Sequence, residues 1–294
     1  MSNDLKLTTF EIERNSRNVH TLRNFYSADW GQTLLFAPDL HWDNPKSDHA
    51  LIKKHFDEAK RRNAKIMLFG DTFCLMQGKY DPRGNKSDLR PEHQVHDYFD
   101  SIVRTAVDFF GPYADNICLV TQGNHETSVL KRHETDIVTR FVDMMNIVHR
   151  PIQPIQSGGY GGWVRFVFDR ENSSDKRTVK LKYFHGSGGG GIVTKGMITN
   201  QRRQAQTQGA DIIVSGHVHE DVMATFSYEH LNEKGVVEIR HTQHIIAGTY
   251  KEEFADGDHG WHIERGAPPK PLGGAWLDFF CEGGEIKFNT YRAK

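Results

Sequence analysis

Gly123-Asn124-His125-Glu126 follows the apolar run Ile117-Cys118-Leu119-Val120, and this succession of a buried strand and polar residues decides the fold. Four other apolar runs end in the same way, each in side chains that bind metal ions. These side chains are Asp39 and His41 after 33–36, Asp71 after 66–70, His185 after 183–184, and His217 and His219 after 212–216. One such run would mean little, because a lone histidine on a strand is more often a packed or exposed residue than a ligand. Five in succession indicate a single site for two metal ions.

The composition is that of a globular protein, because 37% of the 294 residues are hydrophobic and 26% are charged. A chain of this length buries about three quarters of its unfolded surface, so one large domain is expected. The net charge of −1 argues against a protein that wraps long nucleic acid, but it leaves room for a short phosphorylated ligand. Cys74, Cys118 and Cys281 form no CxxC pair, which argues against a disulfide framework or a zinc finger.

The N-terminus, residues 1–6, lacks the basic start and apolar centre of a signal peptide. No apolar run approaches the ~20 residues that a membrane-spanning helix needs. We therefore expect a cytoplasmic protein with no membrane partner.

Strands and helices alternate through the first half of the chain. Residues 1–30 are polar and weakly patterned, and we expect them to form an extension that packs on a single domain of residues 31–294. The expected elements are strand 33–37, a helix from Ser47 to Arg62, strand 65–69, a helix opened by Pro91, strand 117–121 and a helix from Thr135 to Val148. This alternation predicts a parallel sheet, which collects ligands at the carboxyl ends of its strands.

After residue 152 the pattern changes to that of half-exposed antiparallel strands. We expect strands at 164–168, 179–184, 211–215, 222–228, 236–240, 243–247, 275–280 and 284–290, and a polar helix around 198–207. These strands predict a second sheet packed against the first. Residues 222–294 are expected to supply C-terminal strands and a rim over the active site.

The spacing within two of the motifs suits a metal cluster. Residues i and i+2 of an extended segment point the same way, about 6.6 Å apart, so Asp39 and His41 can face one cluster. His217 and His219 can do the same. Two metal ions held roughly 3.5 to 4 Å apart also need a bridging carboxylate. Asp71, at the end of a central strand, is the best candidate for that bridge.

The candidate ligands are carboxylate, amide and imidazole groups, without a thiolate. This set favours two divalent metal ions over a structural zinc site, with Mn²⁺ as the first choice and Fe, Zn²⁺ or Ni²⁺ as alternatives. The ions outweigh the negative charges of Asp39, Asp71 and a bridging hydroxide. The centre should therefore attract phosphate oxygens.

The ordered motifs D-x-H, G-D, G-N-H-[DE], H and G-H-x-H resemble those of the calcineurin-like metallophosphoesterase family. The resemblance implies an α/β fold, a four-layer α/β/β/α sandwich with two mixed β-sheets between helices. It implies one metal held by Asp39, His41, Asp71 and His219, and a second held by Asp71, Asn124, His185 and His217. In that family a hydroxide that bridges the metals attacks phosphorus, and the histidine of G-N-H, here His125, protonates the leaving oxygen as general acid.

One departure from the family pattern bears on the substrate. The serine/threonine protein phosphatase branch carries G-D-x-x-D-R-G, whereas this chain reads Gly70-Asp71-Thr72-Phe73-Cys74-Leu75-Met76. The aspartate that supports the catalytic histidine and the arginine that grips phosphate are both missing, which argues against a protein phosphatase. Asp43 or Glu126 could orient His125 in place of that aspartate.

Two further segments are candidates for contacts with the substrate. The glycines after His185 would let backbone N–H groups approach a phosphate, and a lysine could add charge, so Gly188, Gly189 and Lys195 are candidate substrate-binding residues. The alternative is a flexible turn without a ligand. For the histidine-rich segment 241–262 the alternatives are a solvent-facing loop, a rim or cap over the site, and a third metal site.

We therefore expect a binuclear phosphoesterase that hydrolyses a phosphodiester or a phosphomonoester, on a phosphorylated small molecule, a nucleotide or a nucleic-acid end. An exonuclease or endonuclease of the repair-nuclease branch is an alternative, although no extended nucleic-acid groove is evident. A second alternative is a non-catalytic interaction scaffold with the same fold. Such scaffolds usually lose ligands or the catalytic histidine, whereas this chain keeps all of them.

Overall fold

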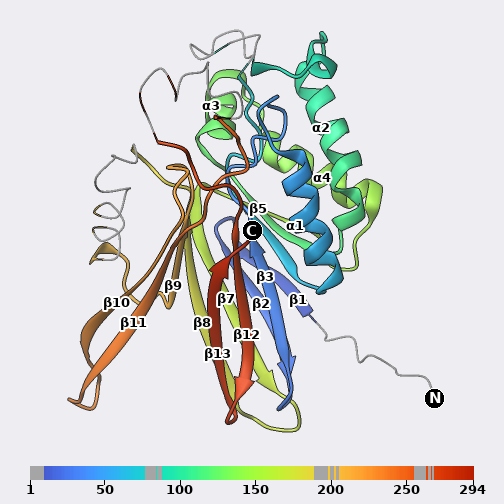
Figure 1. Cartoon of the computed structure of the whole chain (residues 1–294). Coiled ribbons are helices and arrows are strands. Elements are labelled where there is room, and N and C mark those ends of the chain that lie inside the picture. The colour runs from blue at the N-terminus through green and yellow to red at the C-terminus, as the bar shows by residue number, and fades with distance from the viewer. Residues whose placement is uncertain are drawn as a thin grey trace.

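Two mixed β-sheets pack face to face in the computed structural model, and helices cover the outer side of one of them (Figure 1). The structure describes residues 10–76, 84, 88–188, 198, 202, 205–254, 263, 266 and 268–294. The predicted α/β class with two mixed sheets is confirmed, and it is the class that the family resemblance implies. No helix in the described part of the chain is long and apolar enough to cross a bilayer.

The six-stranded sheet holds the first three predicted strands side by side. Its order is β13 (Glu285–Arg292), β12 (Ala275–Glu282), β3 (Gly31–Phe36), β4 (Lys65–Phe69), β5 (Ile117–Thr121) and β6 (Gln156–Gly158). β3 to β6 run parallel to one another, whereas β12 is antiparallel to β3 and to β13. Because β3, β4 and β5 run the same way, their carboxyl ends meet at one edge of the sheet.

The seven-stranded sheet contains the predicted strands between residues 164 and 247. Its order is β1 (Phe10–Ser16), β2 (Val19–Tyr26), β7 (Gly161–Arg170), β8 (Lys176–Phe184), β9 (Ile212–Ser215), β11 (Val237–Ile246) and β10 (Val222–Leu231). β8 and β9 are parallel neighbours. Their carboxyl ends therefore also lie together. The predicted strands 275–280 and 284–290 were expected in this sheet as well, but they are β12 and β13 of the six-stranded sheet, because β12 pairs with β3.

The two sheets bury a common apolar layer. Phe69 of β4 stacks on Tyr183 of β8, with ring centroids 5.6 Å apart, and Phe166 of β7 packs on Phe279 of β12 at 4.9 Å. Each pair joins one sheet to the other. Aromatic pairs of this kind add about 0.5–1.5 kcal/mol to the stabilisation from buried area. They help to fix how the strand ends of the two sheets face each other.

A second apolar layer lies between the six-stranded sheet and its helices. These helices are α1 (His49–Arg61), α2 (Tyr98–Phe110) and α4 (Ile137–His149). In α1 the buried residues Ile52, Phe56 and Ala59 recur at the spacing of one helix face. Burial of that face against the sheet gives the helix most of its stability.

The first helix begins later than predicted. It starts at His49 and not at Ser47, because Asp48 is the cap. The Asp48 side chain accepts a hydrogen bond from the backbone N–H of Leu51 at 2.9 Å. Serine and aspartate are similarly favourable at the N-cap of a helix, so the sequence alone does not tell which of the neighbours Ser47 and Asp48 is the cap.

The other two predicted helices also begin later. Pro91 opens only a 3₁₀ turn, η2 (Pro91–His93), and α2 starts at Tyr98. α4 starts after Asp136, whose side chain caps the helix, and not at Thr135. Both helices are present, but the predicted start is seven residues too early for α2 and two residues too early for α4.

Some elements differ from the predicted pattern more strongly. Hydrophobic spacing does not indicate α3 (Asn124–His133) or the short strand β6. The predicted strands 236–240 and 243–247 are one strand, β11, which pairs with β10 along its whole length. Half of the residues of the polar helix expected around 198–207 are described, and among them residues 198, 202, 205 and 206 are helical.

Residues 10–26 are built into the seven-stranded sheet and do not pack on the domain as a separate extension. β2 pairs with β7 along its whole length, and Leu22 and Tyr26 are completely buried. The sequence hides this strand because His20, Thr21 and Asn24 are buried as well, so polar and apolar residues do not alternate.

Leu22→Ala should lower the free energy of unfolding by about 2–5 kcal/mol, because the truncation leaves a cavity between the sheets. Glu13→Ala, at an exposed position of β1, is the control and should change it by less than about 0.5 kcal/mol. Urea denaturation followed by circular dichroism measures both. Small changes in both variants would show that β2 is not part of the core.

Candidate metal centre

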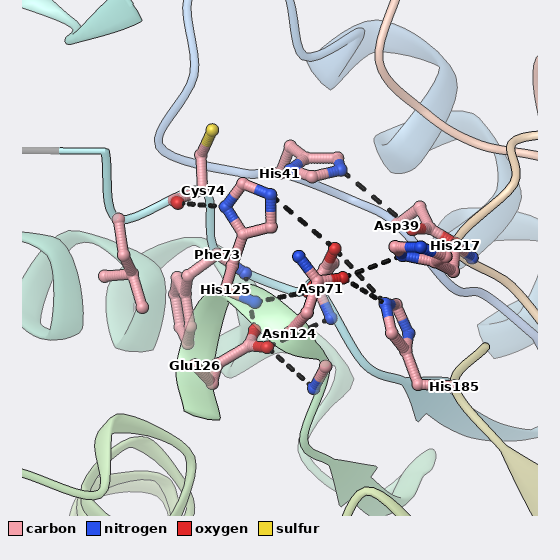
Figure 2. A network of polar contacts seen from close by, with 12 residues as sticks. Asp39, His41, Asp71, Phe73, Cys74, Asn124, His125, Glu126, His185 and His217 are labelled. Atoms are coloured by element: carbon pink, nitrogen blue, oxygen red, sulfur yellow. Dashed lines mark hydrogen bonds and ion pairs between the residues drawn. The ribbon is translucent and has the colours of Figure 1, made fainter. Parts of the chain in front are cut away.

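Loops after five strands bring their polar residues to one place, where the carboxyl ends of β3, β4, β5, β8 and β9 meet (Figure 2). The loops carry Asp39 and His41, Asp71, Asn124 and His125, His185, and His217 and His219, in this order. The structure thus brings all the predicted metal-binding and catalytic residues together.

The first group of candidate ligands is Asp39, His41 and His219, whose ligand atoms lie within 4.8 Å of one another. The Nε2 atoms of the two histidines are 3.4 Å apart. Asp39 Oδ1 lies 3.4 Å from His219 Nε2. Asp39 and His41 are buried, and His219 is half-buried. These three residues and Asp71, the predicted bridging ligand, make up the first predicted ligand set.

The second group is Asp71, His185 and His217, again with ligand atoms within 4.8 Å of one another. Asp71 Oδ2 lies 3.2 Å from His185 Nε2. Asn124 completes the group, because its Oδ1 lies 3.2 Å from His185 Nε2 and 2.8 Å from His217 Nδ1. The four members of the second predicted ligand set therefore face one another.

Hydrogen bonds on the far side of the ligands aim these side chains. His185 donates Nδ1–H to the backbone carbonyl of Phe69 at 2.9 Å, and its Nε2 then faces Asp71. The backbone N–H of His217 donates to Asp39 Oδ2 at 2.8 Å. Both bonds run from the seven-stranded sheet to the six-stranded sheet. The centre is therefore tied to the packing of one sheet on the other.

The glycines of the motifs lie against ligands of other motifs. A Cβ on Gly123 would lie 2.1 Å from Asp71 Oδ1, and one on Gly70 would lie 2.4 Å from His185 Nδ1. The glycine of G-H-x-H is blocked in the same way, with its Cβ 2.3 Å from Asp39 Oδ2. Such contacts are far inside van der Waals distance. Glycine is required at these positions because a ligand already occupies the space.

The D-x-H and H-x-H pairs converge through a left-handed backbone and not through the extended geometry that the spacing suggested. The φ angles are 51° at Asp39, 45° at His41, 69° at His217 and 54° at His219, and Asp71 has 46°. A non-glycine residue in this region costs of the order of 1–3 kcal/mol. Such strain is typical of functional sites, where the surrounding structure holds the residues in place.

Opposite charges within the centre support each other. Burial by itself raises the pKa of Asp71, but His185, His125 and His41 together outweigh burial and hold this pKa well below its usual range. Burial likewise lowers the pKa of His185, but Asp71 raises it to about 10. Burial lowers the pKa of His41 and of His217, so these two rings are neutral and ready to bind a metal.

The residues of these two groups are suited to binding metal ions. Asp39 Oδ1 is buried and has no hydrogen-bond donor in the described part of the chain. Such an oxygen is costly to bury unless a cation binds it. The two groups offer imidazole nitrogens, carboxylate oxygens and one amide oxygen, which suit Mn²⁺, Fe or Zn²⁺.

His125 faces the centre from the start of α3. Its Nε2 lies 3.8 Å from Asp71 Oδ2, and its ring packs edge-on against His41 with centroids 4.9 Å apart. Its Nδ1 is hydrogen-bonded to the backbone carbonyl of Cys74, which Figure 2 shows. A carbonyl thus orients the ring, and it belongs to the residue that stands where the protein phosphatase branch has aspartate.

Asp43 and Glu126 are the two residues that the sequence offers as partners of His125. Their hydrogen bonds to the loop 71–75 go to backbone N–H groups. Burial, with Asp71 nearby, raises the pKa of Glu126 to about 8. Both carboxyl groups therefore act on the loop that carries the orienting carbonyl.

Little of the predicted substrate contact can be located. Gly188 is exposed, has a φ of 80°, and a Cβ there would meet nothing within 4 Å. Gly189 and Lys195 lie outside the described residues. The candidate phosphate loop therefore stays a prediction.

The segment 241–262 contributes to the centre through residues that are not histidines. The hydroxyl of Thr249 and the backbone N–H of Tyr250 both donate to the carbonyl of Asp39, at 3.1 and 3.0 Å. Lys251, which no sequence motif marks, lies next to the site, since its charge lowers the pKa of the buried His41, although burial itself is the larger cause. Residues 255–262 lie outside the described part of the chain, so the rim, the solvent-facing loop and the third metal site all stay predictions for this segment.

Comparisons with known proteins give distant structural likenesses. No family model matches the sequence, and no curated protein matches it. Similar solved structures include vacuolar protein sorting 29 (Vps29) from Cryptosporidium parvum, with 11% identity over 90% of this chain and 99% of that chain and a TM-score of 0.37. Vps29 complexed with Zn²⁺ from Entamoeba histolytica has 10% identity, coverage of 89% and 99%, and a TM-score of 0.34. A conserved uncharacterized protein, a predicted phosphoesterase from Streptococcus pneumoniae, is 13% identical over 89% of this chain and 99% of that chain, with a TM-score of 0.30. Likenesses this distant assign no activity to this chain.

Gly123→Ala should abolish binding of at least one metal ion, because the new methyl group displaces Asp71. Gly159→Ala is the control, since a Cβ there approaches no atom closer than 4.0 Å. Elemental analysis after loading with Mn²⁺ and desalting measures the metal content, and circular dichroism checks folding. A folded Gly123→Ala variant with the metal content of the wild type would contradict the role of this contact.

Metal binding should strengthen as the pH rises from 6 to 9. His185 carries a proton below its raised pKa of about 10, and a metal ion must displace that proton. The release of one proton raises the apparent affinity by up to about tenfold per pH unit. Calorimetric titration with Mn²⁺ in buffers of different ionisation enthalpy measures affinity and proton release together. An affinity that does not change with pH would refute this assignment.

Proposed function

We propose that this chain is a calcineurin-like metallophosphoesterase that hydrolyses phosphate esters with two divalent metal ions. The position of Asp71 carries the proposal. Its carboxylate belongs to the second ligand group, 3.2 Å from His185, and it also faces the proposed proton donor His125 at 3.8 Å. Two bound ions would neutralise charge on the phosphate and activate water for attack.

His125 is the proton donor in the proposed reaction. Its Nδ1 is occupied by the carbonyl of Cys74, so Nε2 is the nitrogen that faces the centre. The ring is half-buried, which leaves it accessible to a bound ester. Transfer of the Nε2 proton to the departing oxygen removes the need to expel an alkoxide.

A phosphodiester, as in a nucleotide or a nucleic-acid end, is the proposed substrate class. A monoester carries more negative charge than a diester and needs a further cation, the role of the arginine that is missing here. Lys251 lies near the site, but its ammonium group is already 2.7 Å from a carboxylate oxygen of Glu253. This pairing favours the substrate with the smaller charge.

The test is hydrolysis of bis-p-nitrophenyl phosphate against p-nitrophenyl phosphate with added Mn²⁺. We expect turnover of both and a higher kcat/KM for the diester. A higher value for the monoester would refute the substrate class but not the enzyme. No turnover together with no bound metal would refute the enzyme and favour the interaction scaffold. Single- and double-stranded DNA then separate a nuclease from a nucleotide phosphodiesterase.

His125→Ala should retain the metal ions and lose about 10²- to 10⁴-fold in rate on an ester with a poor leaving group. The loss on an activated p-nitrophenyl ester should be much smaller, because p-nitrophenolate leaves without a proton. Matched phenyl and p-nitrophenyl esters of one phosphate measure the difference. His133→Ala, at the far end of α3, is the control and should match the wild type. Equal losses on both esters would exclude a proton donor.

A further inference from the structure

Asp43 is a buried carboxylate that does not belong to either ligand group. It is 1% exposed and lies two residues beyond His41. Its Oδ1 accepts a hydrogen bond from the backbone N–H of Cys74, and its Oδ2 accepts one from Leu75 at 2.9 Å. The hydroxyl of Tyr98 lies 3.4 Å from Oδ2. A carboxylate that accepts two consecutive N–H groups holds both peptide planes in place.

The N–H of Leu75 and the carbonyl of Cys74 belong to the same peptide unit. This unit is planar and trans, so its carbonyl points away from its N–H. Asp43 therefore holds one end of a peptide dipole whose other end meets His125 Nδ1. Leu75 has a φ of 53°, which is unfavourable for leucine, so the loop needs a fixed contact to keep this shape.

We propose that Asp43 is a positioning residue that orients His125 through the backbone carbonyl of Cys74. The proposal rests on the role of His125 as proton donor. The negative charge of Asp43 polarises the peptide unit and makes its carbonyl a stronger acceptor for the Nδ1–H group. Asp43 thus orients His125 through the peptide unit between Cys74 and Leu75, without a direct hydrogen bond to the ring in this link.

Glu126 performs a similar task for the metal ligands. It accepts hydrogen bonds from the backbone N–H groups of Asp71 at 3.1 Å, Phe73 at 3.0 Å and Gly123 at 2.8 Å. It therefore joins the G-D loop to the G-N-H loop beside the bridging carboxylate. A change at Glu126 should disturb the metal ions, whereas a change at Asp43 should disturb the proton donor.

The side chain of Cys74 has no part in this link. Its Sγ accepts a hydrogen bond from Asn44 Nδ2 at 3.2 Å, whereas its carbonyl meets His125. Cys74→Ala keeps the carbonyl and should leave His125 in place. This variant separates a backbone contact from a side-chain contact at the position where the protein phosphatase branch has aspartate.

The experiment compares Asp43→Asn, Cys74→Ala and Glu126→Gln, each loaded with Mn²⁺. The amide of asparagine keeps one acceptor oxygen and cannot accept the second N–H. Asp43→Asn should keep the metal content and lose about 10²-fold in kcat on the phenyl ester, with little loss on the p-nitrophenyl ester. Cys74→Ala keeps the carbonyl, so any loss of kcat should be equal on the two esters and should not show the selective loss on the phenyl ester. Glu126→Gln should lose metal.

A second readout does not depend on turnover. The Nδ1 proton of His125, which is hydrogen-bonded to the carbonyl of Cys74, should give a downfield resonance in the proton NMR spectrum that disappears in His125→Ala. Asp43→Asn should shift or broaden this resonance, and Cys74→Ala should not. If Asp43→Asn does not fold, Asp43→Ser, whose hydroxyl also leaves one N–H unpaired, serves in its place.

The outcomes separate this proposal from the function on which it rests. If the wild type hydrolyses neither ester, the proposed function fails, and the resonance still tests the contact. If the wild type is active, equal losses on both esters in Asp43→Asn, or an unchanged resonance, would overturn the positioning role. Wild-type behaviour of Asp43→Asn in both measurements would do the same.

Discussion

A negative charge buried among imidazole rings is the constraint on which this structure depends. Asp71 is 2% exposed, so its carboxylate is stable only where donors and cations replace water. His185 from one sheet and the backbone N–H of His125 from the other supply these partners. The two sheets must therefore meet in one register, and the aromatic layer between them secures it. Sheet packing and the candidate centre depend on each other.

The places of the candidate ligands could be predicted from the sequence, because parallel strands end at one edge of a sheet. An apolar run such as 117–121 marks a buried strand, and whatever follows it must lie at that edge. Helix boundaries were harder to predict. Ser47 and Asp48 stand side by side and both suit a cap, so only the folded geometry chooses Asp48.

Hydrogen bonds made by the backbone could not be predicted, because every residue type offers the same backbone carbonyl. Any residue at position 74 would present a carbonyl to His125, so the sequence directs attention to the charged side chains of Asp43 and Glu126. Both carboxylates bind N–H groups. β2 could not be predicted for a different reason, because its buried polar residues interrupt the alternation of polar and apolar residues that marks a strand. Sequence patterns report side-chain chemistry, and this site uses the main chain as well.

The wide separation of the candidate ligands along the chain has a consequence for the synthesis of the protein. Asp39 and Asp71 leave the ribosome long before His217 and His219, and β12, which closes the sheet beside β3, comes later still. A nascent chain therefore has the carboxylates without the imidazoles that complete the centre. In the proposed enzyme, the complete set of ligands can therefore form only after β9 and the loop that follows it have been synthesised.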